Sequence, residues 1–219
     1  MLKYTLTNDE KIPAIVTRGD NSTPVWIQSR WPEEDKYSVY VRHTGCGHCC
    51  TSMALNLCGV KINPHEEYTY CREKWGEPRM GEPLFEDNFL SQTGIAEIVN
   101  SFNVKAEAFG VPENGAHDAA KHIEKALADG KLVIFWSHPS EKLPDNPFST
   151  GEHYVLFCGF MDDGKILVAN SGVKGHTQNG IQFTDIETIE KCIFEGTQTT
   201  DYTWGRHNFS KSGAYVVVG

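Results

Sequence analysis

A cysteine at the junction of a glycine turn and a predicted helix is the most chemically informative feature of this 219-residue sequence, since Cys46 directly follows Gly45. From Cys49 to Asn56 nothing breaks a helix, and Gly59 is placed to end it. The pattern therefore puts Cys46 at a helix N-terminus, where unpaired backbone N–H groups and the helix dipole favour the thiolate, the form of cysteine that attacks carbonyls and disulfides. Cys46 can equally be one of the small buried residues that free cysteines commonly are, and the segment alone leaves both interpretations open.

Two further residues would complete a catalytic group if the fold brings them to Cys46. His153 opens a predicted strand, and Asn170 ends the partner strand of the same hairpin. The start of one strand and the end of the other lie side by side in a hairpin, so Asn170 is placed to reach a ring nitrogen of His153. A cysteine, a histidine and an asparagine so arranged supply the nucleophile, base and orienting group of cysteine acyl transfer. Each also has a plainer interpretation, with His153 one of nine histidines and Asn170 a residue of the turn at Ser171 and Gly172.

The same cysteine belongs to a second candidate chemistry, thiol–disulfide exchange. The tetrapeptide Cys46-Gly47-His48-Cys49 is identical to the active site of protein disulfide isomerases and puts both sulfurs at one helix N-terminus. However, that fold needs a hydrophobic strand ending in an aromatic residue before the first cysteine, and the preceding residues here are Val41-Arg42-His43-Thr44-Gly45. A zinc site around His48 and Cys71 lacks a second ligand pair at ordinary spacing, so we expect no metal and no cofactor.

The elements that must position these residues divide the chain into a helical half and a strand-rich half. Short extended pieces are expected before residue 41, with Val25–Gln28 a strand or strand end, and loops around short helices are expected from 61 to 93. Hydrophobic periodicity predicts helices near 49–58, 95–102, 116–128 and 185–194. Strands are predicted at 104–109, 132–136, 153–160, 165–169, 180–183 and 213–218, with a long polar loop at 137–152. Helices first and an antiparallel sheet afterwards predict an α+β fold.

Composition limits the partners of the chain. A net charge of −9 without clustered Lys and Arg argues against a nucleic-acid or anionic-membrane surface. The sequence has neither a basic region followed by an apolar one at its start nor a membrane-spanning stretch, so we expect a cytoplasmic protein. Seven cysteines, an odd number, favour reduced thiols, with Cys58 and Cys158 as packing residues. The oligomeric state does not follow from the sequence.

Four motifs in a fixed order carry a family resemblance across roughly residues 25 to 172. They are the hydrophobic segment with a glutamine at Val25–Trp31, the cysteine helix at Cys46–Gly59, the Gly-x-His-hydrophobic strand at Gly151–Val155, and the strand at Gly164–Ser171. This ordered set resembles the papain-like peptidases that process double-glycine bacteriocin leaders, and in particular their stand-alone bacterial relatives. Within the cysteine helix, the matching positions are Cys46, Gly47, Met53, Leu55, Asn56 and Gly59.

The resemblance implies a papain-like α+β cysteine peptidase fold, with an N-terminal helical half packed on a C-terminal antiparallel sheet in one domain of residues 1–219. It implies that Cys46 is the nucleophile, His153 the general base and Asn170 the residue that orients the histidine. It also implies that Gln28 helps to form the oxyanion hole. The expected substrate is a peptide or a small amide, and no metal or cofactor is needed.

The sequence departs from the family pattern at several positions. His48 replaces the usual proline of the first helical turn, Asn170 stands where aspartate is more common, and Cys49 and Cys50 have no family role. Papain-like enzymes also orient their histidine with asparagine, so the change at 170 is compatible with catalysis. A catalytically inactive binding module on the same fold is the third alternative, beside the hydrolase and the dithiol exchanger.

Overall fold

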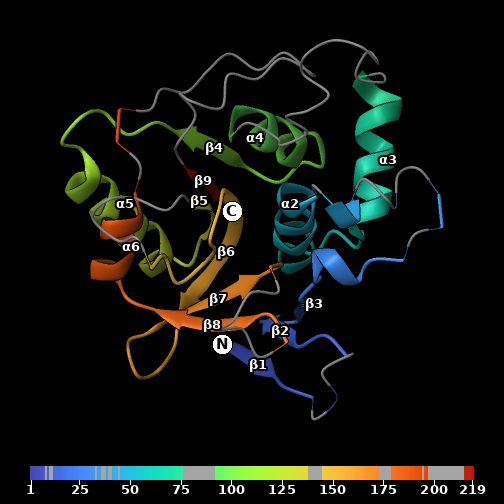
Figure 1. Cartoon of the computed structure of the whole chain (residues 1–219), viewed down its shortest axis with the longest axis horizontal. Helices are drawn as coiled ribbons and strands as arrows, with labels where there is room; N and C mark the ends of the chain where they lie inside the picture. Colours follow the sequence, from blue (N-terminus) through green and yellow to red (C-terminus); the bar gives the residue numbers. More distant parts are fainter. Residues whose placement is uncertain are drawn as a thin grey trace.

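The architecture is known from a computed structural model that describes residues 1–7, 9, 12–32, 34–35, 38, 41–43, 45–75, 92–137, 145–172, 179–193, 195–196 and 215–219. These ranges contain five helices, one 3₁₀ turn and nine strands, and the strands form two sheets (Figure 1). None of the helices in these ranges combines the length and the apolar character needed to cross a membrane.

A six-stranded antiparallel sheet forms the centre of the molecule, with strands in the order β4-β9-β5-β6-β7-β8. Their bounds are β4 (Ala106–Phe109), β5 (Leu132–Ser137), β6 (His153–Phe160), β7 (Ile166–Asn170), β8 (Ile181–Thr184) and β9 (Tyr215–Val218). β5 and β7 are buried along their whole length. A strand buried at every position needs cover on both sheet faces, which the helices supply.

The helices pack on opposite faces of this sheet. α2 (Cys46–Leu57) and α4 (Gln92–Ser101) share one core with it, and α5 (Ala116–Ala128) and α6 (Ile186–Cys192) share the other. α3 (Pro64–Trp75) packs against α2 away from the sheet. The resulting arrangement of helices and an antiparallel sheet confirms the predicted α+β class.

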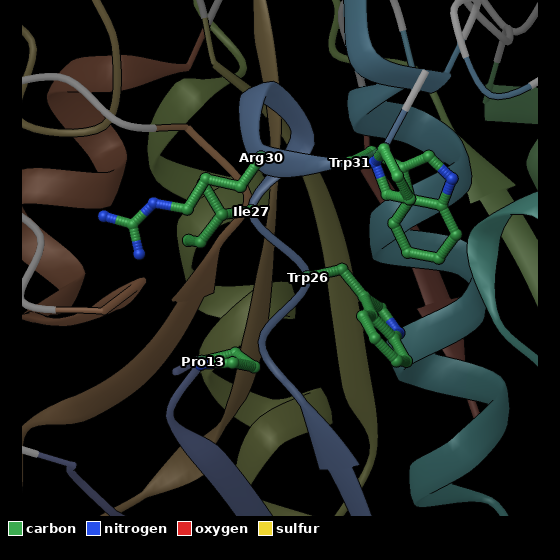
Figure 2. A pocket seen from close by; sticks show the side chains of 6 residues that line it. Pro13, Trp26, Ile27, Arg30 and Trp31 are labelled. Atoms are coloured by element: carbon green, nitrogen blue, oxygen red, sulfur yellow. The ribbon is translucent and has the colours of Figure 1, made fainter. Parts of the chain in front are cut away.

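A small three-stranded antiparallel sheet, β1 (Leu2–Thr5), β2 (Ile15–Arg18) and β3 (Asn21–Pro24), precedes the helices. Of the two predictions for Val25–Gln28, a strand or a strand end, the strand is wrong. β3 ends at Pro24, the N–H of Val25 makes one more backbone bond to Ala14 O at 2.8 Å, and the chain then forms the 3₁₀ turn η1 (Gln28–Arg30). Beside η1 lies a mainly apolar pocket of about 310 Å³ (Figure 2), lined by Pro13, Trp26, Ile27, Arg30, Trp31 and Pro32.

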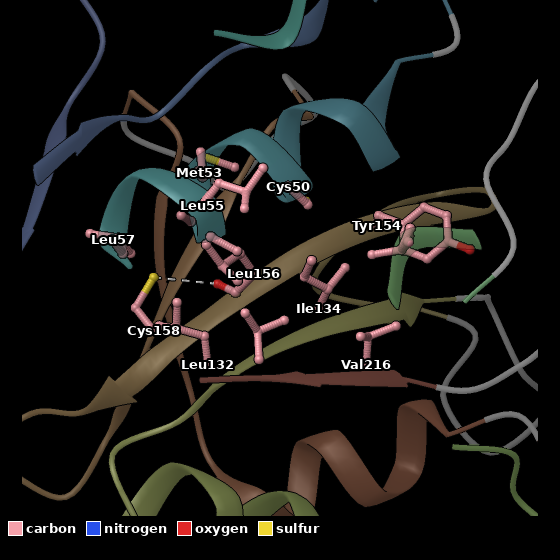
Figure 3. Packing of buried hydrophobic residues seen from close by; sticks show 14 of the residues in the cluster. Cys50, Met53, Leu55, Leu57, Leu132, Ile134, Tyr154, Leu156, Cys158 and Val216 are labelled. Carbon is pink, nitrogen blue, oxygen red and sulfur yellow. Dashed lines mark hydrogen bonds between the residues drawn. The ribbon is translucent and has the colours of Figure 1, made fainter. Parts of the chain in front are cut away.

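The core between α2 and the sheet holds the cysteine helix in place. Figure 3 shows side chains of α2, among them Leu55, directed at Ile134, Leu156 and Val216 of β5, β6 and β9. Burial of each such side chain contributes about 1.5–3 kcal/mol. Cys158 lies in the same core at 3% exposure, as predicted for a packing cysteine, whereas Cys58 is only half-buried.

α2 ends as its sequence predicts. Gly59 adopts a φ of +95°, a conformation that favours glycine, and its N–H donates to Asn56 O at 3.0 Å. The N–H of Val60 reaches back to Leu55 O at 2.9 Å. These two bonds form a Schellman motif and satisfy carbonyls that the helix leaves open.

Loops around short helices were expected from 61 to 93, and the first part of this segment forms the 12-residue α3. A capping box begins this helix: Asn63 Oδ1 accepts from the N–H of Glu66, and Glu66 Oε2 accepts from the N–H of Asn63, both at 2.9 Å. Pro64 occupies the first helical position, where its missing N–H costs nothing. Many charged residues and a weak apolar face make the helical periodicity of α3 hard to detect in the sequence, but the motif Asn63-Pro64-His65-Glu66 is typical of a helix start. Residues 76–91 of that segment lie outside the described ranges, as do residues 138–144 of the predicted loop at 137–152.

Candidate active site

Cys46 is the first residue of α2, as the sequence predicts, and Gly45 is its N-cap. The Gly45 N–H donates to Val41 O at 3.0 Å, and Gly45 O accepts from the N–H of Cys49 at 2.8 Å. A Cβ atom at position 45 would lie 2.6 Å from both Cα and O of Val41. Glycine is therefore required here by a close approach of two backbones, and this contact fixes where the first turn of α2 begins.

The Cys46 thiol is buried, at 1% exposure. Desolvation raises its pKa to about 11, and hydrogen bonds from the backbone N–H groups of Tyr154, Gly47 and Cys46 itself only partly oppose this rise. The expectation that the helix terminus would favour the thiolate in the free protein is therefore wrong. Burial outweighs the N-terminal groups, because a thiolate shielded from water loses more solvation than these donors return.

The effect of the Tyr154 backbone on this pKa also places the thiol near that residue. Tyr154 is the second residue of β6 and directly follows His153. The Cys46 sulfur therefore lies at the N-terminal end of β6, where the histidine is carried. α2 and β6 meet in the core shared by the helix and the sheet, and this packing brings together residues that are more than a hundred positions apart.

His153 and Asn170 are in direct contact, as the predicted hairpin requires. His153 Nε2 lies 2.8 Å from Asn170 Oδ1, and both residues are buried. In the ladder, Asn170 pairs with Val155, so the asparagine is diagonal to the histidine across β6 and β7. The side chains at the start of one strand and the end of the other thus meet at one end of the sheet.

Three other groups fix the orientation of the Asn170 amide. Its Nδ2 donates to Phe148 O and to Gln182 Oε1, each at 2.9 Å, while its Oδ1 accepts from the N–H of Gly172 at 2.7 Å. Since Oδ1 can only accept, His153 must donate from Nε2. The neutral imidazole therefore carries its lone pair on Nδ1, which is available to take a proton.

Burial controls the charge of His153 as well. Desolvation lowers its pKa from 6.5 to about 4, and the hydrogen bond to Asn170 opposes the shift. Burial thus lowers the pKa of His153 and raises the pKa of Cys46. At neutral pH the site holds a neutral imidazole and a neutral thiol.

Gly172 and Gln182 belong to the site, although sequence reasoning did not assign them. A Cβ atom on Gly172 would lie 3.0 Å from both Asn170 Oδ1 and His153 Nε2, so the glycine covers their hydrogen bond closely. Gln182 is 8% exposed and also donates to Pro147 O at 3.0 Å. A polar residue within the short apolar strand at 181–184 was the available signal for Gln182.

Gln28 begins η1 and is half-buried. Its backbone N–H donates to Ser171 O at 2.9 Å, so the segment lies against the residue that follows Asn170. This contact brings the first of the four motifs beside the last. The role of the Gln28 side-chain amide in an oxyanion hole stays a prediction.

The cysteines at the start of α2 are buried, which bears on the dithiol motif Cys46-Gly47-His48-Cys49. All seven cysteines are free thiols, and Cys49 and Cys50 are fully buried. Burial raises the pKa of both thiols, with the neighbouring Cys46 adding to the effect. Dithiol exchange needs an accessible thiolate and a resolving partner. Neither Cys49 nor Cys46 has such an environment.

Comparison with known proteins relates the chain to a family of peptidases. The structure aligns with the crystal structure of a candidate C39-like peptidase from Bacillus anthracis, with a TM-score of 0.46 and 10% identity. The alignment covers 81% of this chain and 89% of the other chain. A likeness of that extent does not by itself establish a function. No curated protein matches the sequence. The model of the Peptidase_C39 like family matches residues 24–201, which include the helix of Cys46 and the hairpin of His153 and Asn170. By this match over most of its length, the chain belongs to the Peptidase_C39 like family.

Proposed function

We propose that the chain is a cysteine peptidase or amidase that acts by acyl transfer, with Cys46 as nucleophile, His153 as general base and Asn170 as the orienting residue. The observation that carries the proposal is the tautomer of His153. Asn170 holds the proton on Nε2, which leaves Nδ1 as the acceptor, and the backbone of Tyr154, the residue next to His153, lies close enough to the Cys46 thiol to lower its pKa. Membership of the Peptidase_C39 like family supports a peptide as the substrate.

In the proposed reaction, His153 Nδ1 takes the thiol proton as the Cys46 sulfur attacks the substrate carbonyl carbon. The imidazolium then gives this proton to the leaving amine, and the carbon–nitrogen bond breaks to give a thioester on Cys46. A water molecule, deprotonated by the same nitrogen, attacks the thioester, the carbon–sulfur bond breaks to release the acid, and the imidazolium returns its proton to the Cys46 sulfur. Throughout, Asn170 keeps the ring in place and its Nε2 protonated.

The oxyanion that develops at the carbonyl requires donors. The backbone N–H of Cys46 at the start of α2 is one, and the side-chain amide of Gln28 is the proposed other. Each such donor contributes about 3–4 kcal/mol to transition-state stabilisation in comparable sites. The pocket beside η1 adjoins Gln28 in the sequence and offers apolar and aromatic side chains to a substrate residue.

Burial has a kinetic consequence in this mechanism. The raised pKa of Cys46 and the lowered pKa of His153 disfavour an ion pair before substrate arrives. The thiolate therefore forms together with the attack rather than as a stable resting species. An unspecific alkylating reagent is expected to react slowly with Cys46, whereas a peptide-like electrophile that fills the site is expected to react quickly.

Competition between two electrophiles tests the proposal. The protein is treated with a peptide-derived epoxide or vinyl sulfone and, separately, with iodoacetamide, and the modified residues are mapped by mass spectrometry. We expect the peptide-derived probe to label Cys46 and iodoacetamide to prefer Cys58, the one half-buried thiol among six buried ones. Labelling of Cys58 by both probes, with Cys46 unmodified, would contradict the proposal and favour an inactive binding module.

The variant Cys49→Ser separates hydrolysis from dithiol exchange. An acyl-enzyme mechanism needs one sulfur, so labelling of Cys46 and turnover should persist in this variant. Dithiol exchange needs a second sulfur to release the mixed disulfide. Reduction of insulin by the wild type that is abolished in Cys49→Ser would assign the chain to the redox class.

A further inference from the structure

A second group of chemically reactive side chains lies between α2 and α3, outside the proposed catalytic group. His48 belongs to the first turn of α2, and Glu67 and Cys71 lie four residues apart on α3, so the latter two share one helix face. One ligand-type atom from each lies within 4.8 Å of the other two. Their exposures are 1%, 0% and 0%.

Glu67 is the centre of this cluster. Its Oε2 hydrogen-bonds with His48 Nδ1, and its Oε1 accepts from Cys71 Sγ at 3.4 Å. A fully buried carboxylate is costly unless a positive charge accompanies it. Arg72, five residues after Glu67 on α3, donates to Tyr68 Oη at 2.9 Å and lies over the Tyr68 ring. The His48 imidazolium or a metal ion would supply such a charge beside the carboxylate.

The donor set favours a metal ion of borderline softness. Imidazole nitrogen, thiolate sulfur and carboxylate oxygen are the three ligand types of protein zinc sites. Zinc–ligand bonds of about 2.0–2.3 Å place the donors of a tetrahedral site roughly 3–4 Å apart. The 4.8 Å limit that encloses His48, Glu67 and Cys71 thus requires only small side-chain movements. Because one carboxylate oxygen faces each partner, a bidentate Glu67 would bring the number of donor atoms to four.

From this juxtaposition we infer that His48, Glu67 and Cys71 form a zinc site that fastens α2 to α3. Binding replaces two protons by the metal, the Cys71 thiol proton and the proton between His48 Nδ1 and Glu67 Oε2, and both are released to water; Nδ1 then donates its lone pair to the metal. The site is closed to solvent, so the metal enters as the chain folds rather than by diffusion into the native state. Its role is structural: it fixes the first turn of α2, two residues after Cys46.

The spacing of the ligands explains why sequence reasoning expected no metal. The sequence has no second pair of ligands at the ordinary spacing of a structural zinc site, and the bounds of the short helices expected within residues 61–93 were not defined. Once Pro64–Trp75 is a helix, Glu67 and Cys71 become neighbours one turn apart. The inference is independent of the proposed function, since it concerns a different set of side chains.

Metal content tests the inference directly. The full chain is refolded with Zn²⁺, dialysed and assayed by elemental analysis in a Cys46→Ala background, because a cysteine–histidine pair at the candidate active site could itself retain zinc. We expect one zinc per chain, retained equally in Cys46→Ala with Cys192→Ser, whose cysteine is buried on the other sheet face. With Cys71→Ser or Glu67→Gln added instead, we expect at least a tenfold loss of zinc affinity.

Cobalt substitution keeps the test decisive if a cluster variant fails to fold. In the Cys46→Ala background with the cluster intact, Co²⁺ should give an intense near-ultraviolet thiolate-to-metal band. Absence of this band, no zinc in the refolded protein, or zinc retained in folded Cys71→Ser would each overturn the inference. The cluster would then be a buried His48–Glu67 ion pair with a hydrogen-bonded thiol.

Discussion

Asn170 uses every polar atom of its side chain inside the candidate site. Its Oδ1 serves His153 and Gly172, and its Nδ2 serves the oxygens of Phe148 and Gln182. The oxygens of Phe148 and Gln182 are acceptors, and an amide can donate to them whereas a carboxylate cannot. This explains in physical terms how asparagine can stand at a position where the family more often has aspartate.

Replacement of Asn170 by aspartate tests this reading of the site. The carboxylate would face two oxygen acceptors that have lost their donor, and an unmet buried acceptor costs about 1–3 kcal/mol. We expect Asn170→Asp to lower the free energy of unfolding by that amount and to reduce turnover, measured by urea denaturation and by peptide hydrolysis. Unchanged stability would mean that the amide hydrogen bonds contribute little.

Gly172 covers the hydrogen bond between His153 and Asn170 so closely that a methyl group would lie 3.0 Å from both polar atoms. We expect Gly172→Ala to push the imidazole out of line and to lower kcat/KM at least tenfold with the fold retained by circular dichroism. Gly151→Ala is the matched control, since a Cβ there meets nothing within 4 Å. Equal activity of the two variants would show that the position of the ring is not critical.

The start of α2 is the element that positions the nucleophile, and it rests on the contact of Gly45 with Val41. A side chain at 45 would displace one of the two backbones, and such overpacking costs about 1–3 kcal/mol. We expect Gly45→Ala to lower stability by this amount and also to slow labelling of Cys46 by a peptide-derived electrophile.

Asn63→Ala is the control for that experiment. It removes the capping box of α3 and should cost about 1 kcal/mol in the free energy of unfolding. Because Asn63 lies away from the start of α2, labelling of Cys46 should persist. If both variants slow labelling equally, the loss reflects stability in general rather than the placement of Cys46.

Elements with strong periodicity or clear end signals were predictable from the sequence. α2 follows from Gly45 and Gly59, and the hairpin of β6 and β7, with its contact between His153 and Asn170, follows from strand alternation around a turn. The bounds of α3 were not predicted, because its many charged residues leave only a weak periodicity of apolar side chains. The pKa of Cys46 was not predictable either, since it depends on how completely β6 covers the end of α2, which is a property of packing.

At the scale of the molecule, the candidate site joins two layers. Cys46 comes from the helical layer, while His153 and Asn170 come from the sheet, and the proposed approach of Cys46 to His153 depends on the core that α2 shares with β6. The site is therefore expected to form only when the layers have docked. Loss of activity during denaturation should coincide with global unfolding rather than precede it.

The buried imidazole also makes the stability of the whole molecule depend on pH. An unfolded histidine binds a proton below about pH 6.5, whereas folded His153 resists protonation down to about 4. Between these values the unfolded state holds more protons, so acidification favours unfolding, by up to roughly 3 kcal/mol at about 1.4 kcal/mol per unit of pKa shift. We expect His153→Gln to lose this component, so that its unfolding free energy falls less than that of the wild type between pH 6.5 and 4. Parallel pH profiles from urea denaturation would contradict the burial of a neutral His153.

Capture of the acyl-enzyme is the most direct measurement of the central claim, that Cys46 transfers acyl groups with His153 as its base. The protein is mixed with an activated acyl ester, quenched in acid, digested and mapped by mass spectrometry over time. The account predicts a thioester on Cys46 in the wild type and in Cys49→Ser, formed at least tenfold more slowly in His153→Gln. An acyl group found only on Cys58, or one on Cys46 that forms equally fast in His153→Gln, would contradict it.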